Sequence, residues 1–192
     1  MFIEKINFNI DLDQMLLDLT QVEKEIGWPE KMFTHNNRSY HANQIGLTYR
    51  AGSEQPWFDA SGSLYDKEQK HFIGKESDFT EWNSVGEYTR SIIENLSNHV
   101  GIHFGRIRYM KLLPKTGLSV HHDFEPRYHL VLKTNPHAYF LDCTQEGDVQ
   151  AKAYHIPADG YFYKVDTLRN HSVFNGGWEP RIHLVLAEYK TD

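Results

Sequence analysis

The sequence predicts a mainly β fold with N-terminal helices, in which the strands close as a sandwich, a jelly roll or a barrel. Two helical patterns lie in the first 100 residues, and near residue 103 the apolar period changes from helical to two. Eight short strand-like segments then follow one another. Helices first and strands second indicate segregated layers, and eight is the strand number of a jelly roll, which we therefore expect.

The two predicted helices have start and stop signals. Asp11 can cap the first helix, whose apolar residues recur at helical spacing until Gly27 ends it. The second helix is expected from about 85 to 99, with a capping box that opens at Ser84 and closes at Glu87. Both helices have one apolar face, so both are expected to pack against a core.

The stretch between the helices is expected to hold one strand and one long loop. Residues 44–50 alternate as a strand does. Residues 51–82 are rich in Gly, Ser, Asp and Lys and also carry aromatic side chains, which a disordered linker rarely keeps. Long loops in compact domains are usually functional, so we expect a loop or lid here.

Turn-forming residues separate the eight predicted strands. The strands are expected at 104–113, 118–122, 127–133, 138–142, 150–155, 161–165, 171–174 and 181–188. With 192 residues, the chain has room for one full core and an appendage. We therefore expect one domain, 1–192, in which about 1–102 form a helical and loop support with the lid, and about 103–190 form the β core.

The composition excludes several classes of protein. Lys and Arg are scattered, and 20 of them face 26 Asp and Glu, so the chain has no basic footprint for nucleic acid. No apolar run approaches the roughly 18 residues of a membrane span, and the N-terminus lacks the pattern of a secretory signal. Cys143 is the one cysteine and has no partner for an internal disulfide. We expect a cytoplasmic protein without nucleic-acid or membrane partners.

The strongest functional pattern is His121-x-Asp123 in the second predicted strand. Alternation along a strand places His121 and Asp123 on the same face. An imidazole from a distant strand would complete a facial triad of two His and one carboxylate, which binds Fe(II) and leaves coordination positions open. His171 in the seventh predicted strand is the candidate. The pair alone is expected by chance in a chain with 12 His, so its combination with His171 and with Arg181 in the eighth strand carries the prediction.

Five motifs lie between about residues 104 and 188. They are Arg108-Tyr109-Met110-Lys111-Leu112-Leu113-Pro114, His121-x-Asp123, Arg127-Tyr128-His129-Leu130, His171-x-Val173-x-Asn175 and Arg181-Ile182-His183-Leu184. Together they resemble the aspartyl/asparaginyl β-hydroxylase superfamily. The resemblance implies a double-stranded β-helix, a cupin-like jelly roll, and an oxygenase that depends on Fe(II), 2-oxoglutarate and O2. It also implies a dioxygenase that hydroxylates an amino acid, either free or within a protein, so that the partner is a small molecule or a peptide.

The resemblance implies roles for six residues. His121, Asp123 and His171 would bind the iron, and Arg181 would bind the 5-carboxylate of 2-oxoglutarate, which suits a planar, permanently charged guanidinium. Arg127 and His129 would lie beside the cosubstrate and the substrate. One branch of the family, which hydroxylates epidermal-growth-factor-like domains, has a small residue in place of the carboxylate ligand. Because Asp123 is present here, the chain is similar to the members with all three ligands.

Two other functions are compatible with the same pattern. A cupin-type metalloenzyme would use the His residues without 2-oxoglutarate, and a jelly-roll binding module would have no activity. The remaining strand histidines, His122, His103, His155 and His183, are expected to be ordinary strand residues that face solvent or form hydrogen bonds. Asn175 is expected to satisfy the backbone of a turn.

Overall fold

The structure is a computed structural model that describes residues 1–35, 38–66, 68–84, 86–144 and 151–190. The chain divides into two compact units. The first, here called the β unit, comprises Met1–Leu12 and Lys111–Val185, and the second, the helical unit, comprises Asp13–Met110 and Leu186–Asp192. The single domain expected from the sequence, with its division near residue 102, stays a prediction.

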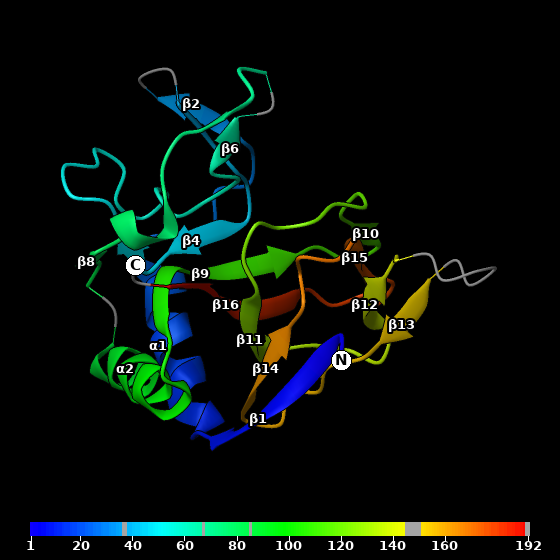
Figure 1. Ribbon diagram of the computed structural model, residues 1–192. Helices are drawn as coiled ribbons and strands as arrows, with labels where there is room; N and C mark the ends of the chain where they lie inside the picture. Colours follow the sequence, from blue (N-terminus) through cyan, green and yellow to red (C-terminus); the bar gives the residue numbers. More distant parts are fainter. Residues whose placement is uncertain (36–37, 67, 85, 145–150, 191–192) are drawn as a thin grey trace. The chain divides into compact units, whose positions relative to one another are not determined.

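The β unit contains two antiparallel layers of strands (Figure 1). In the first layer the order is β1 (Ile3–Asn9), β14 (Tyr161–Val165), β11 (Arg127–Lys133) and β16 (Arg181–Tyr189), of which the residues up to Val185 belong to this unit. In the second layer the order is β10 (Thr116–Gly117), β15 (His171–Asn175), β12 (Ala138–Asp142) and β13 (Lys152–Tyr154).

Buried side chains from both layers share one core. Val131 and Val165 come from the first layer, and Phe140 and Val173 come from the second. Along β12 buried and half-buried residues alternate, as expected for a strand with one face on a core. Two antiparallel layers over a common core confirm the predicted jelly roll.

Most strand predictions agree with the structure, but several differ. The segment predicted as one strand at 44–50 forms two short strands, Gln44–Gly46 and Thr48–Tyr49, which pair with different partners. Residue 150 of the strand predicted at 150–155 lies outside the described residues. Strand β1 was not predicted, and neither were the short strands Phe33–His35 and Arg38–Tyr40. β1 pairs with β14 through a register shift between Lys5 and Asn9.

The strand predicted at 118–122 is wrong. The regular strand there is β10, and beyond it only His121 forms a bridge, to His171. Leu118 and Val120 are both exposed, so the alternation of apolar residues in this segment does not reflect burial.

The helical unit contains α1 (Leu12–Glu25) and α2 (Glu87–Val100), each of which buries one face. Its strands form antiparallel pairs. They are β2 (Phe33–His35) with β3 (Arg38–Tyr40), β4 (Gln44–Gly46) with β9 (His103–Leu112), β5 (Thr48–Tyr49) with β8 (Glu81–Trp82), and β6 (Tyr65–Asp66) with β7 (His71–Phe72). The residues of β9 up to Met110 belong to this unit. Within the described part of the chain, neither helix has the length and apolar character of a membrane span.

The start of α2 differs from the predicted capping box. The N-cap is Gly86, which offers no side chain, and predicted position 85 lies outside the described residues. The Asp18 carboxylate of α1 accepts hydrogen bonds from the backbone N–H and the hydroxyl of Thr89 instead. A Cβ at Gly86 would lie 2.0 Å from that carboxylate, so glycine is required for this contact. The capping box opened by Ser84 is therefore wrong, because the cap comes from another helix.

The segment 51–82, predicted as a long loop or lid, contains β6, β7, β8 and the 3-10 helix η1 (Glu76–Asp78). Buried carboxylates bind it to neighbouring elements of the helical unit. Asp59, which is fully buried, pairs with Arg50 at 2.9 Å, and Glu76 pairs with Arg106 of β9. The segment is thus fixed by internal ion pairs, and movement as a lid stays a prediction.

Candidate active site

The structure brings together the three predicted metal ligands within the β unit. One ligand atom each of His121, Asp123 and His171 lies within 4.8 Å of the others. His121 and His171 exchange both backbone hydrogen bonds, at 3.0 and 2.8 Å, and their ring centroids are 4.4 Å apart. The main chain therefore sets the distance between the two imidazoles.

The hydrogen bonds of the two imidazoles leave the same nitrogen of each ring available. Nδ1 of His121 lies 2.8 Å from the carbonyl oxygen of Ser119, and Nδ1 of His171 lies 2.9 Å from that of Arg169. A carbonyl only accepts, so each Nδ1 carries the hydrogen and each Nε2 carries a lone pair. Burial lowers the pKa of His171, which favours the neutral ring that binds metals.

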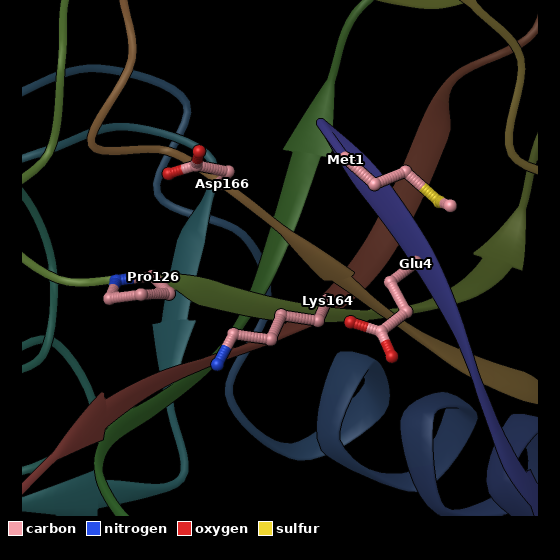
Figure 2. A pocket seen from close by; sticks show the side chains of 5 residues that line it. All are labelled: Met1, Glu4, Pro126, Lys164 and Asp166. Carbon is pink, nitrogen blue, oxygen red and sulfur yellow. The ribbon is translucent and has the colours of Figure 1, made fainter.

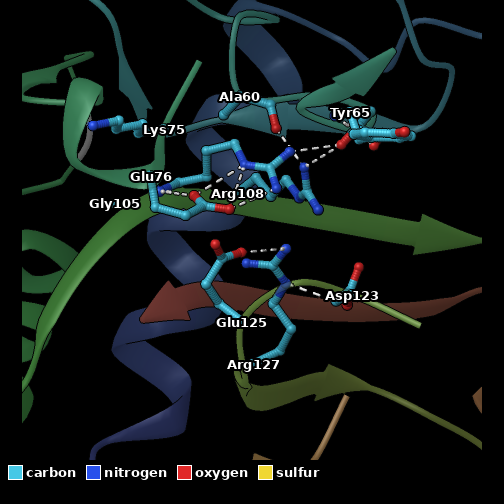
Figure 3. Close-up of polar contacts among 12 residues, drawn as sticks. Ala60, Tyr65, Lys75, Glu76, Gly105, Arg108, Asp123, Glu125 and Arg127 are labelled. Atoms are coloured by element: carbon cyan, nitrogen blue, oxygen red, sulfur yellow. Dashed lines mark hydrogen bonds and ion pairs between the residues drawn. The ribbon is translucent and has the colours of Figure 1, made fainter. Parts of the chain in front are cut away.

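Asp123 is held by its backbone and by an arginine. Its N–H donates to the carbonyl oxygen of Thr167 at 2.8 Å, and Nε of Arg127 lies 3.3 Å from its Oδ2. Arg127 also approaches Glu125 at 3.9 Å, and Figure 3 shows these three side chains together. The same Oδ2 lies 4.0 Å from Nε2 of His171. One carboxylate oxygen is thus oriented toward the imidazoles while a cation stabilises its charge.

Arg181 lies in a second buried cluster of the β unit. Its guanidinium packs 4.8 Å from the ring of Phe140, and its NH2 group lies 3.1 Å from Nδ1 of His183. That Nδ1 is also 3.4 Å from Nδ1 of His129. Burial lowers the pKa of Arg181 to about 9, so it is still a cation at neutral pH. Among the described residues, no carboxylate pairs with it.

Strand β11 connects the triad to this cluster. Arg127 and His129 are two positions apart on β11 and therefore face the same side. Arg127 contacts Asp123, and His129 contacts His183, which contacts Arg181. All six predicted site residues thus fall into two groups that β11 links.

His183, expected to be a strand residue that faces solvent or forms hydrogen bonds, is a strand residue with a hydrogen bond to Arg181 and joins the second buried cluster. It is 1% exposed, and its position two residues after Arg181 on one strand was the available signal for this place. A separate pocket of about 190 Å³ is lined by Met1, Glu4, Pro126, Lys164 and Asp166 (Figure 2). None of these five is a predicted site residue.

A comparison with family models identifies the family of this chain. Residues 20–190 match the family model of aspartyl/asparaginyl β-hydroxylase. A comparison with curated proteins found no significant match.

Several solved structures share the fold. A Pseudomonas putida prolyl-4-hydroxylase has a TM-score of 0.55 at 9% identity, over 100% of this chain and 94% of its own. A 2OG-Fe(II) oxygenase family oxidoreductase from Burkholderia pseudomallei has a TM-score of 0.54 at 10% identity, over 93% of this chain and 80% of its own. IDO from Bacillus thuringiensis has a TM-score of 0.50 at 11% identity, over 100% of this chain and 91% of its own. At such identities these likenesses describe the fold, and the family match confirms the resemblance.

Proposed function

Because the chain belongs to the aspartyl/asparaginyl β-hydroxylase family, we propose that it is an Fe(II)- and 2-oxoglutarate-dependent dioxygenase that hydroxylates an amino acid, free or within a protein. His121, Asp123 and His171 would hold the iron. The observation that carries the proposal is the approach of their three ligand atoms to within 4.8 Å of one another.

The donor set fits a ferrous ion. Two neutral imidazoles and one carboxylate make the facial triad that leaves coordination positions open for a bidentate ligand and O2. The carbonyls of Ser119 and Arg169 accept hydrogen bonds from the rings, which orients each Nε2 and raises its basicity. Arg127 would hold Asp123 as the anionic ligand.

The buried cation at Arg181 fits the distal carboxylate of 2-oxoglutarate. A buried guanidinium without a carboxylate partner is costly, and an anionic ligand would supply the missing charge. The planar fork of Arg181 suits a bidentate contact with a carboxylate. Arg127 and His129, on the β11 face between the two groups, would lie beside the cosubstrate.

The proposed reaction consumes 2-oxoglutarate, O2 and a C–H substrate and gives succinate, carbon dioxide and the hydroxylated product. Bound Fe(II) would supply the oxidative chemistry, in which one oxygen atom enters succinate and the other enters the product. The residues of the chain would bind and orient the reactants. Burial of His171 and Arg181 keeps water from these two groups.

The substrate is proposed only as a class. The Pseudomonas putida neighbour is a prolyl-4-hydroxylase, which supports a small-molecule or peptide substrate. With Cys143 as the one cysteine, we also propose a reducing, cytoplasmic setting.

Anaerobic titration tests the proposal. Purified protein with Fe(II) is expected to develop a visible charge-transfer band when 2-oxoglutarate is added, and air is then expected to release succinate. His171→Ala is expected to lose stoichiometric iron and the band. His122→Ala is the matched control, because His122 is exposed and adjacent to His121 in the sequence, and this variant is expected to keep both.

Two results would contradict the proposal, and each supports a different alternative. Iron binding without an effect of 2-oxoglutarate would indicate a cupin-type metalloenzyme that does not use this cosubstrate. Failure of the wild-type protein to hold any divalent metal would indicate a non-catalytic jelly-roll module.

A further inference from the structure

His183 is a buried imidazole whose two nitrogens have different surroundings. Nδ1 lies 3.1 Å from NH2 of Arg181, whereas Nε2 is buried without a hydrogen-bond partner among the described residues. Buried polar atoms are nearly always hydrogen-bonded, so an unpaired ring nitrogen needs an explanation.

The contact with Arg181 determines which nitrogen of His183 carries the hydrogen. A guanidinium only donates, so Nδ1 must accept with its lone pair. A neutral ring then carries its hydrogen on Nε2. Protonation of Nδ1 would abolish this contact and bring two buried cations together, and burial together with Arg181 lowers the pKa of His183 well below its ordinary value. Nε2–H is therefore a buried donor without an acceptor.

His183, which carries this donor, belongs to a series of contacts along β11 between the triad and Arg181, where the proposed cosubstrate would lie. The contacts run from Asp123 to Arg127 and, further along the same face of β11, from His129 to His183 and Arg181. A ligand that reached from the triad to Arg181 would lie along this face. An unpaired donor costs stability in the free protein, and a ligand oxygen would remove that cost.

We propose that His183 is a binding residue for 2-oxoglutarate: its Nδ1 orients the guanidinium of Arg181, and its Nε2–H donates to the distal carboxylate that Arg181 pairs with. This inference rests on the proposed function. It assigns the distal carboxylate two kinds of donor, one charged and one neutral, so that the ligand brings a single negative charge to a single buried cation. A second anionic group would have no partner there.

Binding to Zn(II)-loaded protein, which does not turn over, tests the assignment by calorimetry. The two ligands are 2-oxoglutarate and 2-oxopentanoate, which has a methyl group in place of the distal carboxylate. His183→Asn keeps an acceptor near the place of Nδ1 but has no donor at the place of Nε2. We expect it to weaken 2-oxoglutarate binding about tenfold, as for one hydrogen bond to a charged group, and 2-oxopentanoate binding less than twofold.

His137→Asn, at an exposed histidine of the β unit, is the matched control and is expected to change neither affinity. Equal losses for the two ligands with His183→Asn would overturn the inference, because a merely structural role affects both. If the wild-type protein bound neither ligand, the proposed function itself would fail. A different result would overturn the inference alone: the wild-type protein prefers 2-oxoglutarate to 2-oxopentanoate, and His183→Asn keeps the same preference.

A measurement on the wild-type protein keeps the test independent of how the variant folds. Nitrogen-15 NMR of the histidine rings distinguishes the two neutral tautomers. We expect His183 to carry its hydrogen on Nε2, and the Nε2 signal to shift with 2-oxoglutarate but not with 2-oxopentanoate. A hydrogen on Nδ1, or equal shifts with both ligands, would overturn the inference.

Discussion

Arg106 of the helical unit and Arg181 of the β unit are both buried arginines, but only Arg106 has a carboxylate. Nε and NH2 of Arg106 bind both oxygens of Glu76, at 2.6 to 3.0 Å, and its NH1 donates to the carbonyl oxygen of Gly62 at 2.7 Å. Arg181 has an imidazole and an aromatic ring beside it instead.

The difference separates a structural cation from one available to a ligand. The chain satisfies the charge of Arg106 within the fold, and this pair holds η1 against β9. The charge of Arg181 is not neutralised in the same way, so its burial lowers the stability of the folded state until an anion binds. Burial alone therefore does not indicate a binding residue, whereas burial without a counter-charge supports the role proposed for Arg181.

The largest effect is expected from Arg106→Met. This change leaves the carboxylate of Glu76 buried without its partner, and breaking a buried pair in this way costs about 3–5 kcal/mol. Urea unfolding of the free protein measures the loss. The double variant Glu76→Leu with Arg106→Met is the control and is expected to recover much of the stability. A loss below about 1 kcal/mol for Arg106→Met would mean that this pair does not hold the segment.

Arg181→Met is expected to show the opposite pattern. Removal of an unneutralised buried cation is expected to leave the free energy of unfolding unchanged or to raise it. In contrast, affinity for 2-oxoglutarate should fall by at least about 30-fold, since truncation of one partner of a buried charge pair costs about 2 kcal/mol or more. Unfolding curves and calorimetry of the same samples check both. The comparison would fail if Arg181→Met destabilised the free protein as much as Arg106→Met.

Asn175 extends the comparison to a buried group without charge. Its Nδ2 donates to the carbonyl oxygens of Leu112, Leu113 and Glu179 at 3.2, 3.2 and 2.9 Å, and its Oδ1 accepts from Gly177 at 3.1 Å. Asn175→Leu leaves these groups unsatisfied, so we expect a loss of about 2 kcal/mol in urea unfolding. An unchanged stability would show that water replaces the amide.

The smallest effect is expected at the half-exposed pair of Lys5 and Asp159, 2.8 Å apart. Burial raises the pKa of Asp159, but hydrogen bonds from Lys5 and Tyr163 outweigh it, so the pKa lies below its usual range. The folded state therefore gains stability from this carboxylate above about pH 4, and loses it as the pH falls through the lowered pKa.

The difference in unfolding free energy between the wild-type protein and Asp159→Asn measures this contribution. At pH 7 it is expected to be about 1 kcal/mol or less. Near pH 2 it should vanish. A difference that grew as the pH fell would show that the carboxylate opposes folding.

The sequence was sufficient where a strand places apolar side chains in the shared core. The predicted bounds of β11, β12 and β14 agree with the structure because their apolar residues lie in the shared core. The strand predicted at 118–122 is wrong because the exposed Leu118 and Val120 repeat with the period of a strand without burial. Strand β1 was not predicted, and a register shift interrupts its pairing with β14.

The site was predictable in part: the metal ligands could be grouped from the sequence, but the contacts of single ring nitrogens could not. His121, Asp123 and His171 could be grouped because a facial triad needs two imidazoles and one carboxylate, and because their motifs carry a family resemblance; the structure brings them together. The role proposed for His183 depends on which ring nitrogen contacts Arg181, and no pattern of residue types contains that information. In the same way, the cap of α2 comes from Asp18, about 70 residues away along the chain.

The backbone bridge between residues 121 and 171 has a consequence for how such a site can change. Since main-chain hydrogen bonds fix the two positions, replacing one imidazole leaves the place of the other undisturbed. Exchange of a single side chain could then alter which metal is preferred without rebuilding the scaffold. New chemistry at this location would require changes in side chains and not in topology.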